Sequence, residues 1–224
     1  MDKPIIGIPS ATVHQAKRWA QSRNAASFFV DLADLYWSLA PSHGMVDPAV
    51  AYAQSAHETG YGHFGGVIDE SYYNPCGLKV AGGGDNHDPN AHQRFRNWEE
   101  GVAAHLDHLA LYAGASGYPR SGSPDPRHFP WIRGTAQTVY SLGGRWAPSS
   151  KYGQIIAERH LLPMQLMQLP LPSIQGPAQV EINGQTAAGY LIDGRAYAPV
   201  RFIAEQAGLT VEWDNRTRTA RIRS

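Results

Sequence analysis

One carboxylic acid in this chain stands where general acid–base chemistry could use it. Glu58 comes near the end of a segment with helical periodicity and directly before a glycine-rich turn at residues 60–62. The segment opens with Asp47 and Pro48, an N-cap residue followed by proline at the first helical position. We therefore expect a helix that carries Glu58 to the lip of a cleft.

The residues that share a helical face with Glu58 are apolar or small. Val50, Ala51, Gln54 and Ser55 fall on its stripe, because helical neighbours recur at three, four and seven residues. This face predicts a carboxyl group against the packed body, where burial raises its pKa and keeps it protonated. A solvated glutamate at a helix C-terminus is the alternative.

Composition excludes several classes of function. The chain has 224 residues, 19 Lys and Arg against 19 Asp and Glu, and a formal net charge of zero. Without a basic run we expect no nucleic-acid partner, because phosphate binding needs clustered Lys and Arg. The apolar cluster at 5–8 is too short for a secretion signal or a membrane span, so we expect no membrane partner. One cysteine, Cys76, excludes an internal disulfide.

The elements that must position Glu58 are mostly helical. Residues 60–95 and 114–130 are too polar and glycine-rich to bury, so we expect irregular loops there, the first with a short hairpin. A long loop beside an acid on a helix is usually functional. Helical periodicity predicts helices at 12–22, 26–39, 47–59, 98–112, 135–141 and 151–162, which together indicate a mainly α domain over 1–168.

A change of period marks a second domain. Residues 169–178 contain three prolines and predict a semi-rigid linker. Residues 179–224 then predict a small α+β module in which a helix after Pro199 separates a hairpin and third strand from two closing strands. So short a module has a marginal core, so self-association into a homo-oligomer is one expectation.

Four blocks occur in a fixed order along the first domain. They are QSAHETGYG at 54–62, NPCGLK at 74–79, FRNWEEG at 95–101 and WAPSSKYG at 146–153. Together they resemble the glucosaminidase family of peptidoglycan hydrolases, glycoside hydrolase family 73. This resemblance implies a lysozyme-like helical fold for the mainly α domain.

The resemblance also implies a function and a catalytic group. It implies an endo-β-N-acetylglucosaminidase that cleaves the glycan of bacterial peptidoglycan, as an endolysin or autolysin, with Glu58 as general acid and no cofactor. Two departures matter: Trp146 replaces a tyrosine of the family, and the loop that often carries a second acidic residue is shortened. Asp85 and Asp88 are the candidates for that second carboxylate.

Aromatic residues in or beside these blocks are candidates for a sugar-binding platform, because pyranose faces stack on rings. Core packing is the alternative for each ring. The predicted substrate-binding residues are Tyr61, Tyr73, Trp98, Trp146 and Tyr152, with Asn74 holding either the loop or an acetamido group.

Other activities stay open. A lytic transglycosylase or a muramidase would use the same fold, and a non-catalytic wall-binding protein would use only its groove. A zinc hydrolase is disfavoured because HETGY at 57–61 lacks a second histidine, although His105 and His108 are three residues apart, and we expect no metal. Cys76 with His87 or His92 would be needed for a cysteine peptidase.

The C-terminal module resembles the small stalk-type domain named after the N-terminal region of copper amine oxidases. It contains no His, Cys or Met, so no copper is expected. Four arginines near its end are either a grip for anionic wall polymers or a solvated edge: Arg216, Arg218, Arg221 and Arg223. With no signal in this chain, action on the wall outside the membrane implies release by phage-type lysis or a removed leader.

Overall fold

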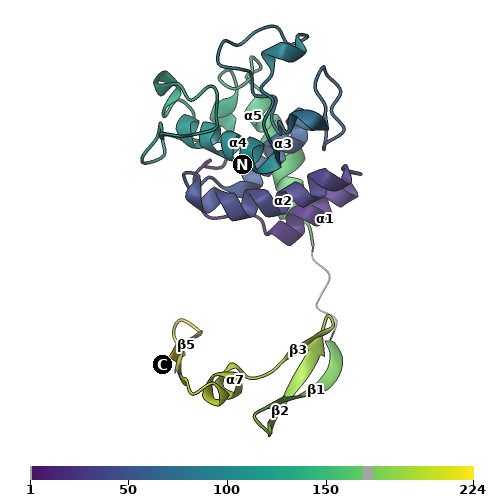
Figure 1. Ribbon diagram of the computed structural model, residues 1–224, viewed down its shortest axis with the longest axis vertical. Helices are drawn as coiled ribbons and strands as arrows, with labels where there is room; N and C mark the ends of the chain where they lie inside the picture. The colour runs from purple at the N-terminus through teal and green to yellow at the C-terminus, as the bar shows by residue number, and fades with distance from the viewer. Residues whose placement is uncertain (1, 169–173) are drawn as a thin grey trace. The chain divides into compact units, whose positions relative to one another are not determined.

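The computed structural model describes residues 2–168 and 174–224. The chain divides between residues 169 and 170 into two compact units, one mainly helical and one strand-rich (Figure 1). The predicted fold class, a mainly α unit and a small α+β module, is confirmed. Within the described ranges no helix is both long and apolar enough to cross a membrane.

The helices of the first unit begin and end close to their predicted bounds. Asp47 caps the third helix by accepting from the Ala49 amide at 2.9 Å, and Asn97 caps the fourth by accepting from the Glu100 amide at 2.9 Å. The main helices are α1 Val13–Ser22, α2 Ser27–Leu39, α3 Pro48–Thr59, α4 Trp98–Ala113, α5 Tyr152–Ile155 and α6 Leu162–Gln165. The shorter turns are η1 Ala40–Ser42, η2 Glu70–Tyr72, η3 Pro89–Ala91, η4 Pro130–Ile132, η5 Tyr140–Leu142 and the π-helical η6 Ile156–Leu161, which joins α5 to α6.

The helix predicted at 135–141 is wrong. Only the 3₁₀ turn η5 forms at its end, because the backbone of this segment bonds to residues near the N-terminus instead of to itself. The Ile5 amide donates to the Gln137 carbonyl at 3.0 Å, and the Val139 amide donates to the Lys3 carbonyl at 2.8 Å. Tertiary pairing thus overrides the local periodicity.

The core of the first unit surrounds α3. Every residue from Pro48 to Ala56 is buried, so α3 has no solvent-facing stripe, and only its last turn reaches the surface. Trp19 and Phe29 are fully buried beside it, and the hydroxyl of Tyr52 on α3 donates to the Phe29 carbonyl at 2.8 Å. A helix buried on all sides holds its C-terminal turn in a fixed position.

The long loop after α3 forms the expected short hairpin. Lys79 and His92 pair as an isolated antiparallel bridge, and the Gln93 amide donates to the Leu78 carbonyl at 2.8 Å. This loop has a small core of its own, in which Cys76, Leu78 and Phe95 are buried against α4. The loop is therefore packed onto α4 at the end of α3 that carries Glu58.

The second unit contains two small antiparallel sheets. Strands β1 Ile174–Ile182, β2 Gln185–Ile192 and β3 Arg195–Tyr197 form the first in that order, and β4 Thr210–Asp214 pairs with β5 Thr219–Arg223 in the second. Helix α7 Val200–Gln206 lies between them in sequence. Asn183 and Gly184 both have positive φ, as a two-residue hairpin turn requires.

The predicted linker at 169–178 is too long at its C-terminal end. Residues 169–173 lie outside the described residues, whereas 174–178 belong to β1. Pro177 stands opposite Tyr190 in this pairing, and the strand tolerates proline because β1 is an edge strand. Ala204 and Val211 are the buried apolar residues of this described module, in agreement with a marginal core.

Gly101 on α4 generates a prediction about how the loop is held. A Cβ at this position would stand 1.8 Å from the Tyr73 carbonyl oxygen, which is backbone and has little freedom to retreat. Gly101→Ala should therefore destabilise the first unit by about 2 kcal/mol, although the same change in an open helix stabilises by roughly 0.5–1 kcal/mol. Urea unfolding measures the change. The exposed Glu99→Ala on the same helix is the control, and a stabilised Gly101→Ala would contradict the close packing.

Candidate active site

The last turn of α3 brings three of the predicted site residues together. Glu58 Oε1 accepts a hydrogen bond from Trp146 Nε1 at 3.1 Å and a second, short one from the Tyr152 hydroxyl. Gly60 then ends the helix in the left-handed conformation that a C-terminal cap needs. A site is thus assembled from segments separated by 88 and 94 residues.

These hydrogen bonds distinguish the two oxygens of the carboxyl group. Both donors reach Oε1, and no hydrogen bond from the described residues reaches Oε2. An oxygen that accepts two donors is the unprotonated oxygen of a carboxylic acid, so the proton belongs on Oε2. The geometry therefore leaves the acidic O–H free to point away from Tyr152 and Trp146.

The environment of Glu58 favours its protonated form. One side of the residue is open to solvent, but protein atoms crowd the carboxyl group, and this desolvation raises its pKa above the ordinary value. The hydrogen bonds from Tyr152 and Trp146 lower the pKa in part, because they stabilise the carboxylate. Desolvation outweighs them, as the sequence predicted for this position.

A chain of buried hydrogen bonds supports Tyr152 from behind. Gln54 Nε2 donates to the Tyr152 hydroxyl at 2.8 Å, and Gln54 Oε1 lies 3.0 Å from His105 Nε2. His105 Nδ1 in turn lies 2.7 Å from the Tyr36 hydroxyl. Burial lowers the pKa of His105 to about 3, so the ring is neutral. One consistent direction of donation then runs from Tyr36 through His105, Gln54 and Tyr152 to Glu58.

Sequence reasoning missed this chain of hydrogen bonds. The sequence places Gln54 on the helical face of Glu58 and in the first of the four blocks, and it places His105 near His108 as a candidate metal pair, but it identifies no hydrogen-bond partner for either side chain. A signal was present, because Gln54 and His105 are polar residues on the apolar faces of two helices, and a buried polar side chain needs a partner.

Glu58 lies beside an open groove. A cavity of about 290 Å³ contains Glu58 on its wall, and a neighbouring cavity of about 350 Å³ contains Trp146. Gly77 and Lys79 line both, so the two cavities are contiguous at the hairpin loop. The first is lined by Glu58, Thr59, Phe64, Gly65, Gly66, Val67, Ile68, Asn74, Gly77, Lys79, Asn86 and His92.

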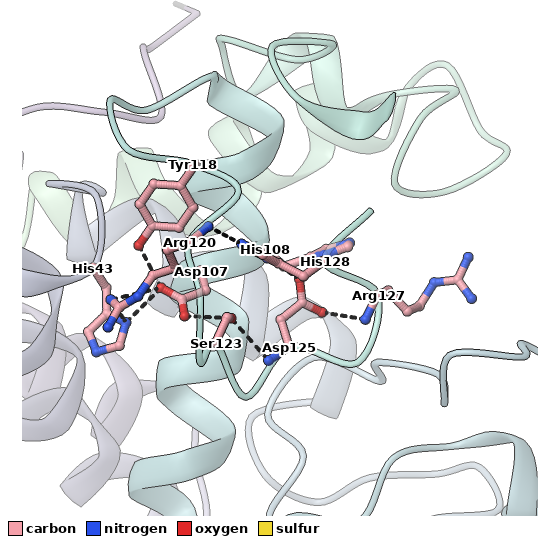
Figure 2. Close-up of polar contacts among 9 residues, drawn as sticks. All are labelled: His43, Asp107, His108, Tyr118, Arg120, Ser123, Asp125, Arg127 and His128. Atoms are coloured by element: carbon pink, nitrogen blue, oxygen red, sulfur yellow. Dashed lines mark hydrogen bonds and ion pairs between the residues drawn. The ribbon is translucent and has the colours of Figure 1, made fainter. Parts of the chain in front are cut away.

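Two buried aspartates, Asp107 on α4 and Asp125 in the segment that follows, hold this segment against the helix. Asp107 accepts from Tyr118 Oη at 2.6 Å and Ser123 Oγ at 2.6 Å, and it lies 2.8 Å from His43 Nδ1 (Figure 2). These hydrogen bonds lower its pKa against the effect of burial. They attach the irregular segment 114–130 to the helical core, which sequence reasoning did not predict.

Comparison with known proteins agrees with this geometry. A family model described as mannosyl-glycoprotein endo-beta-N-acetylglucosaminidase matches residues 33–159, more than half of the 224-residue chain. The chain belongs to the glucosaminidase family. The matched region of this glucosaminidase contains Glu58, Trp146 and Tyr152, so the resemblance inferred from the four blocks is confirmed.

The remaining comparisons are narrower. A second model, the copper amine oxidase N-terminal domain, matches residues 176–223 and confirms the resemblance of the C-terminal module. An uncharacterized protein of Borreliella burgdorferi is 34% identical over 103 residues, which are 46% of this chain and 48% of that protein. The match thus spans about half the length of this relative. No solved structure matches the chain.

The two aspartates predicted as second carboxylates lie away from Glu58 in the glucosaminidase domain. Asp85 accepts from the His87 amide at 2.7 Å, and Asp88 caps η3 by accepting from the Asn90 amide at 2.9 Å. Both are exposed and shape turns of the loop, and neither lines the Glu58 cavity, whereas Asn86 between them does. Their catalytic role stays a prediction that this placement does not support.

Four of the five predicted aromatic residues pack in the protein body: Tyr152 is buried behind Glu58 and lines neither groove cavity, and three others lie elsewhere. Tyr61 lies 5.3 Å from the Trp19 ring, and its hydroxyl lies 3.0 Å from His160 Nδ1, on another side of α3. Trp98 stacks on Phe28 with ring centroids 5.0 Å apart and meets Tyr73 edge to face at 5.5 Å. None of these three rings lines the two groove cavities, so their role in substrate binding stays a prediction that this placement does not support.

Asn74 holds the loop. It is fully buried, and its amide nitrogen donates to the Leu78 and Gln93 carbonyls, each at 2.9 Å. Its amide oxygen accepts from the Leu78 amide at 3.0 Å. These bonds occupy both ends of the amide, so of the two roles predicted for Asn74 the structure favours loop anchoring.

The described residues do not assemble a site for either of the alternative reactions, those of a zinc hydrolase and of a cysteine peptidase. His105 is bonded to Gln54, while His108 Nδ1 lies 2.7 Å from Asp125, so the two rings serve different partners. Across the described residues no group of three or more His, Cys, Asp or Glu side chains could hold a metal ion. Burial raises the pKa of Cys76 well above its ordinary value, opposite to what a nucleophilic thiolate needs.

The hydrogen bond from Tyr152 generates a prediction about Glu58. Tyr152→Phe removes a donor that stabilises the carboxylate, so the pKa of Glu58 should rise. A hydrogen bond to a charged group contributes about 1.5–3 kcal/mol, and one pKa unit equals about 1.4 kcal/mol, so we expect a rise of about one unit or more. Carboxyl-carbon NMR of labelled Glu58 measures this titration. The control is Tyr72→Phe, which removes the hydroxyl of a half-buried tyrosine that bonds to the Pro89 carbonyl. An unchanged or lower midpoint in Tyr152→Phe would refute the contact.

Proposed function

We propose that this protein is a peptidoglycan hydrolase that cleaves the glycan strand as an endo-β-N-acetylglucosaminidase, with Glu58 as general acid. The observation that carries the proposal is the Glu58 carboxyl group, desolvated and bonded through Oε1 alone, on the wall of an open groove. Membership of the glucosaminidase family supports the same reaction. The polymer and the bond cleaved are inferences from that chemistry.

Cleavage begins with proton transfer to the leaving group. Glu58 Oε2 donates its proton to the glycosidic oxygen, the bond from that oxygen to the anomeric carbon breaks, and positive charge develops on the sugar ring. As the carboxyl group loses its proton, the hydrogen bonds from Tyr152 and Trp146 to Oε1 become stronger. The same donors that lower the pKa thus stabilise the product of the transfer.

A second group must then react at the anomeric carbon. Of the described residues that line the Glu58 cavity, Glu58 is the only one with a carboxylate. We therefore propose that the acetamido oxygen of the substrate attacks the anomeric carbon, so no protein nucleophile is required. Water, deprotonated by the Glu58 carboxylate, opens the resulting ring with net retention of configuration.

A lytic transglycosylase is a second candidate that the same observation allows, because it also needs one carboxyl group. In that reaction a hydroxyl of the sugar itself closes on the anomeric carbon in place of water. Mass spectrometry of digested peptidoglycan separates the candidates: reducing-end N-acetylglucosamine supports the proposal, 1,6-anhydromuramic ends support the transglycosylase, and reducing-end muramic acid supports a muramidase.

Glu58→Gln tests the general acid. The amide keeps the size of the side chain and cannot donate a proton from Oε2, so lysis of purified walls should fall by about a hundredfold to ten-thousandfold while the fold persists. Turbidity clearing measures activity, and circular dichroism monitors folding. Glu70→Gln, an exposed glutamate in η2, is the control. Near-normal clearing by Glu58→Gln would remove the assignment.

We further propose that the C-terminal module anchors the enzyme to anionic wall polymers, and that the enzyme acts on the wall outside the membrane. Two of its four clustered arginines are paired, Arg221 with Asp214 at 3.3 Å and Arg223 with Glu212 at 3.2 Å. Arg216 and Arg218 lie in the exposed turn between β4 and β5. These two are therefore the candidates for contact with a polyanion.

Replacing these two arginines tests the anchor. Arg216→Gln with Arg218→Gln should reduce co-sedimentation with purified walls severalfold at low salt and leave turnover of short soluble glycans unchanged. Screening should remove the difference at high salt. Arg201→Gln, which removes an exposed arginine of α7, is the matched control. Equal sedimentation of the double variant and the control would contradict the anchoring role.

A further inference from the structure

The cavity next to Glu58 is strongly cationic. Lys79, Arg127 and Arg145 all line it, and no carboxylate is among the described residues that form its wall. The chain as a whole has a formal net charge of zero, so three positive groups at one cavity are a local excess. Within residues 2–168 none of the three side chains forms an ion pair with a carboxylate.

The nearest buried negative charge is already satisfied. Asp125 accepts from the Arg127 amide at 2.9 Å, and its other oxygen lies 2.7 Å from His108 Nδ1 and 3.0 Å from His128 Nδ1. Figure 2 shows that the guanidinium group of Arg127 points away from this carboxylate. The Asp125 charge therefore does not neutralise the Arg127 side chain by direct contact.

Lys79 is also not paired with a carboxylate. Its Nζ donates to two backbone carbonyls, those of Gly84 at 3.1 Å and Asp85 at 2.8 Å, which hold it at the cavity without neutralising it. The Asp85 side chain is exposed and bonded to His87. Those hydrogen bonds, with a smaller contribution from Lys79, hold the pKa of the Asp85 carboxyl below its usual range.

Tyr112 links this cavity to the Glu58 site. It lines the cavity together with Arg127 and Arg145, and its hydroxyl donates to the Arg145 carbonyl at 3.2 Å. The Tyr112 ring lies 5.8 Å from Trp146, whose indole donates to Glu58. The cationic cavity is therefore continuous with the site of bond cleavage.

We propose that this cavity binds a carboxylate of the substrate strand beside the sugar that is cleaved. The inference rests on the proposed function and specifies its substrate class: an acidic amino-sugar polymer in preference to a neutral one. In peptidoglycan the carboxylate has two sources, the lactyl ether of muramic acid when its peptide is absent and the acidic groups of the stem peptide when it is present. Arginine binds either through paired N–H donors.

Binding measured without turnover tests the proposal. The full-length Glu58→Gln variant is titrated by calorimetry with three probes: glycan strands stripped of peptide, the same strands with their lactyl carboxylates reduced to alcohols, and peptide-bearing strands. We expect the stripped strands to bind about tenfold more tightly than the reduced strands at low salt, and the difference to shrink at high salt.

Substitution of the arginines assigns the effect to the cavity. Arg127→Gln with Arg145→Gln, in the Glu58→Gln background, should weaken binding of carboxylated strands by about tenfold and bring it to the level of the reduced strands. Arg18→Gln, which removes an exposed charge on α1 and lines neither cavity, is the matched control. Lys79 is left intact because it also holds the loop.

Each outcome has a defined consequence. Preference for stripped strands assigns the cavity to the lactyl carboxylate, and preference for peptide-bearing strands assigns it to the stem peptide. Equal binding of stripped, reduced and peptide-bearing strands overturns the proposal, as does an arginine variant that behaves like Arg18→Gln. If the binding proposal fails in this way, hydrolysis of all three probes by the wild-type enzyme would still support the proposed function. Hydrolysis of none of them would contradict the proposed function itself.

Discussion

The site depends on placing a carboxyl group at the end of a helix that is buried on every side. The body of α3 has no freedom to rotate, so Glu58 is presented in one orientation. That position partly desolvates the carboxyl group, and the donors Trp146 and Tyr152 compensate the ionised form for the water that it loses. Because both donate to Oε1, the group is stabilised after it loses its proton while its other oxygen remains available to the substrate. The same arrangement therefore suits both the protonated and the ionised form of Glu58.

Much of the remaining structure keeps those two donors in place. Tyr152 is nearly fully buried and is held by Gln54, which is held in turn by His105 and Tyr36. A neutral His105 transmits this constraint without adding a charge near Glu58, since burial keeps its pKa near 3. Removing one member of this chain of hydrogen bonds would cost free energy, because it would leave a buried polar group without its partner. It fixes geometry rather than taking part in the proton transfer.

The sequence was sufficient where local rules and tertiary packing agree. The capped start of α3 and the hairpin of the C-terminal module follow from short-range chemistry and were predicted. The helix expected at 135–141 failed because that segment pairs with the N-terminal residues, a long-range choice invisible to periodicity. Partner identities were harder still: nothing local to Tyr61 says that it faces His160, and nothing local to Tyr152 says that it faces Glu58. Spacing in the sequence predicts on which face of a helix a side chain lies, but the contacts of that face depend on the tertiary fold.

The acidic and the basic groups of the groove lie in two different cavities, which the zero net charge of the chain does not reveal. In the first cavity the proton donor is the only carboxylate among the described wall residues, whereas the second is surrounded by Lys79, Arg127 and Arg145. Of the described carboxylates near the second cavity, Asp125 is buried and is satisfied by two histidines and a backbone amide, and Asp85 is exposed and bonded to His87. A positive field beside Glu58 would by itself favour the carboxylate and lower its pKa. Desolvation nevertheless determines the direction of the shift, so the groove can attract an anionic strand and still present it with an acid.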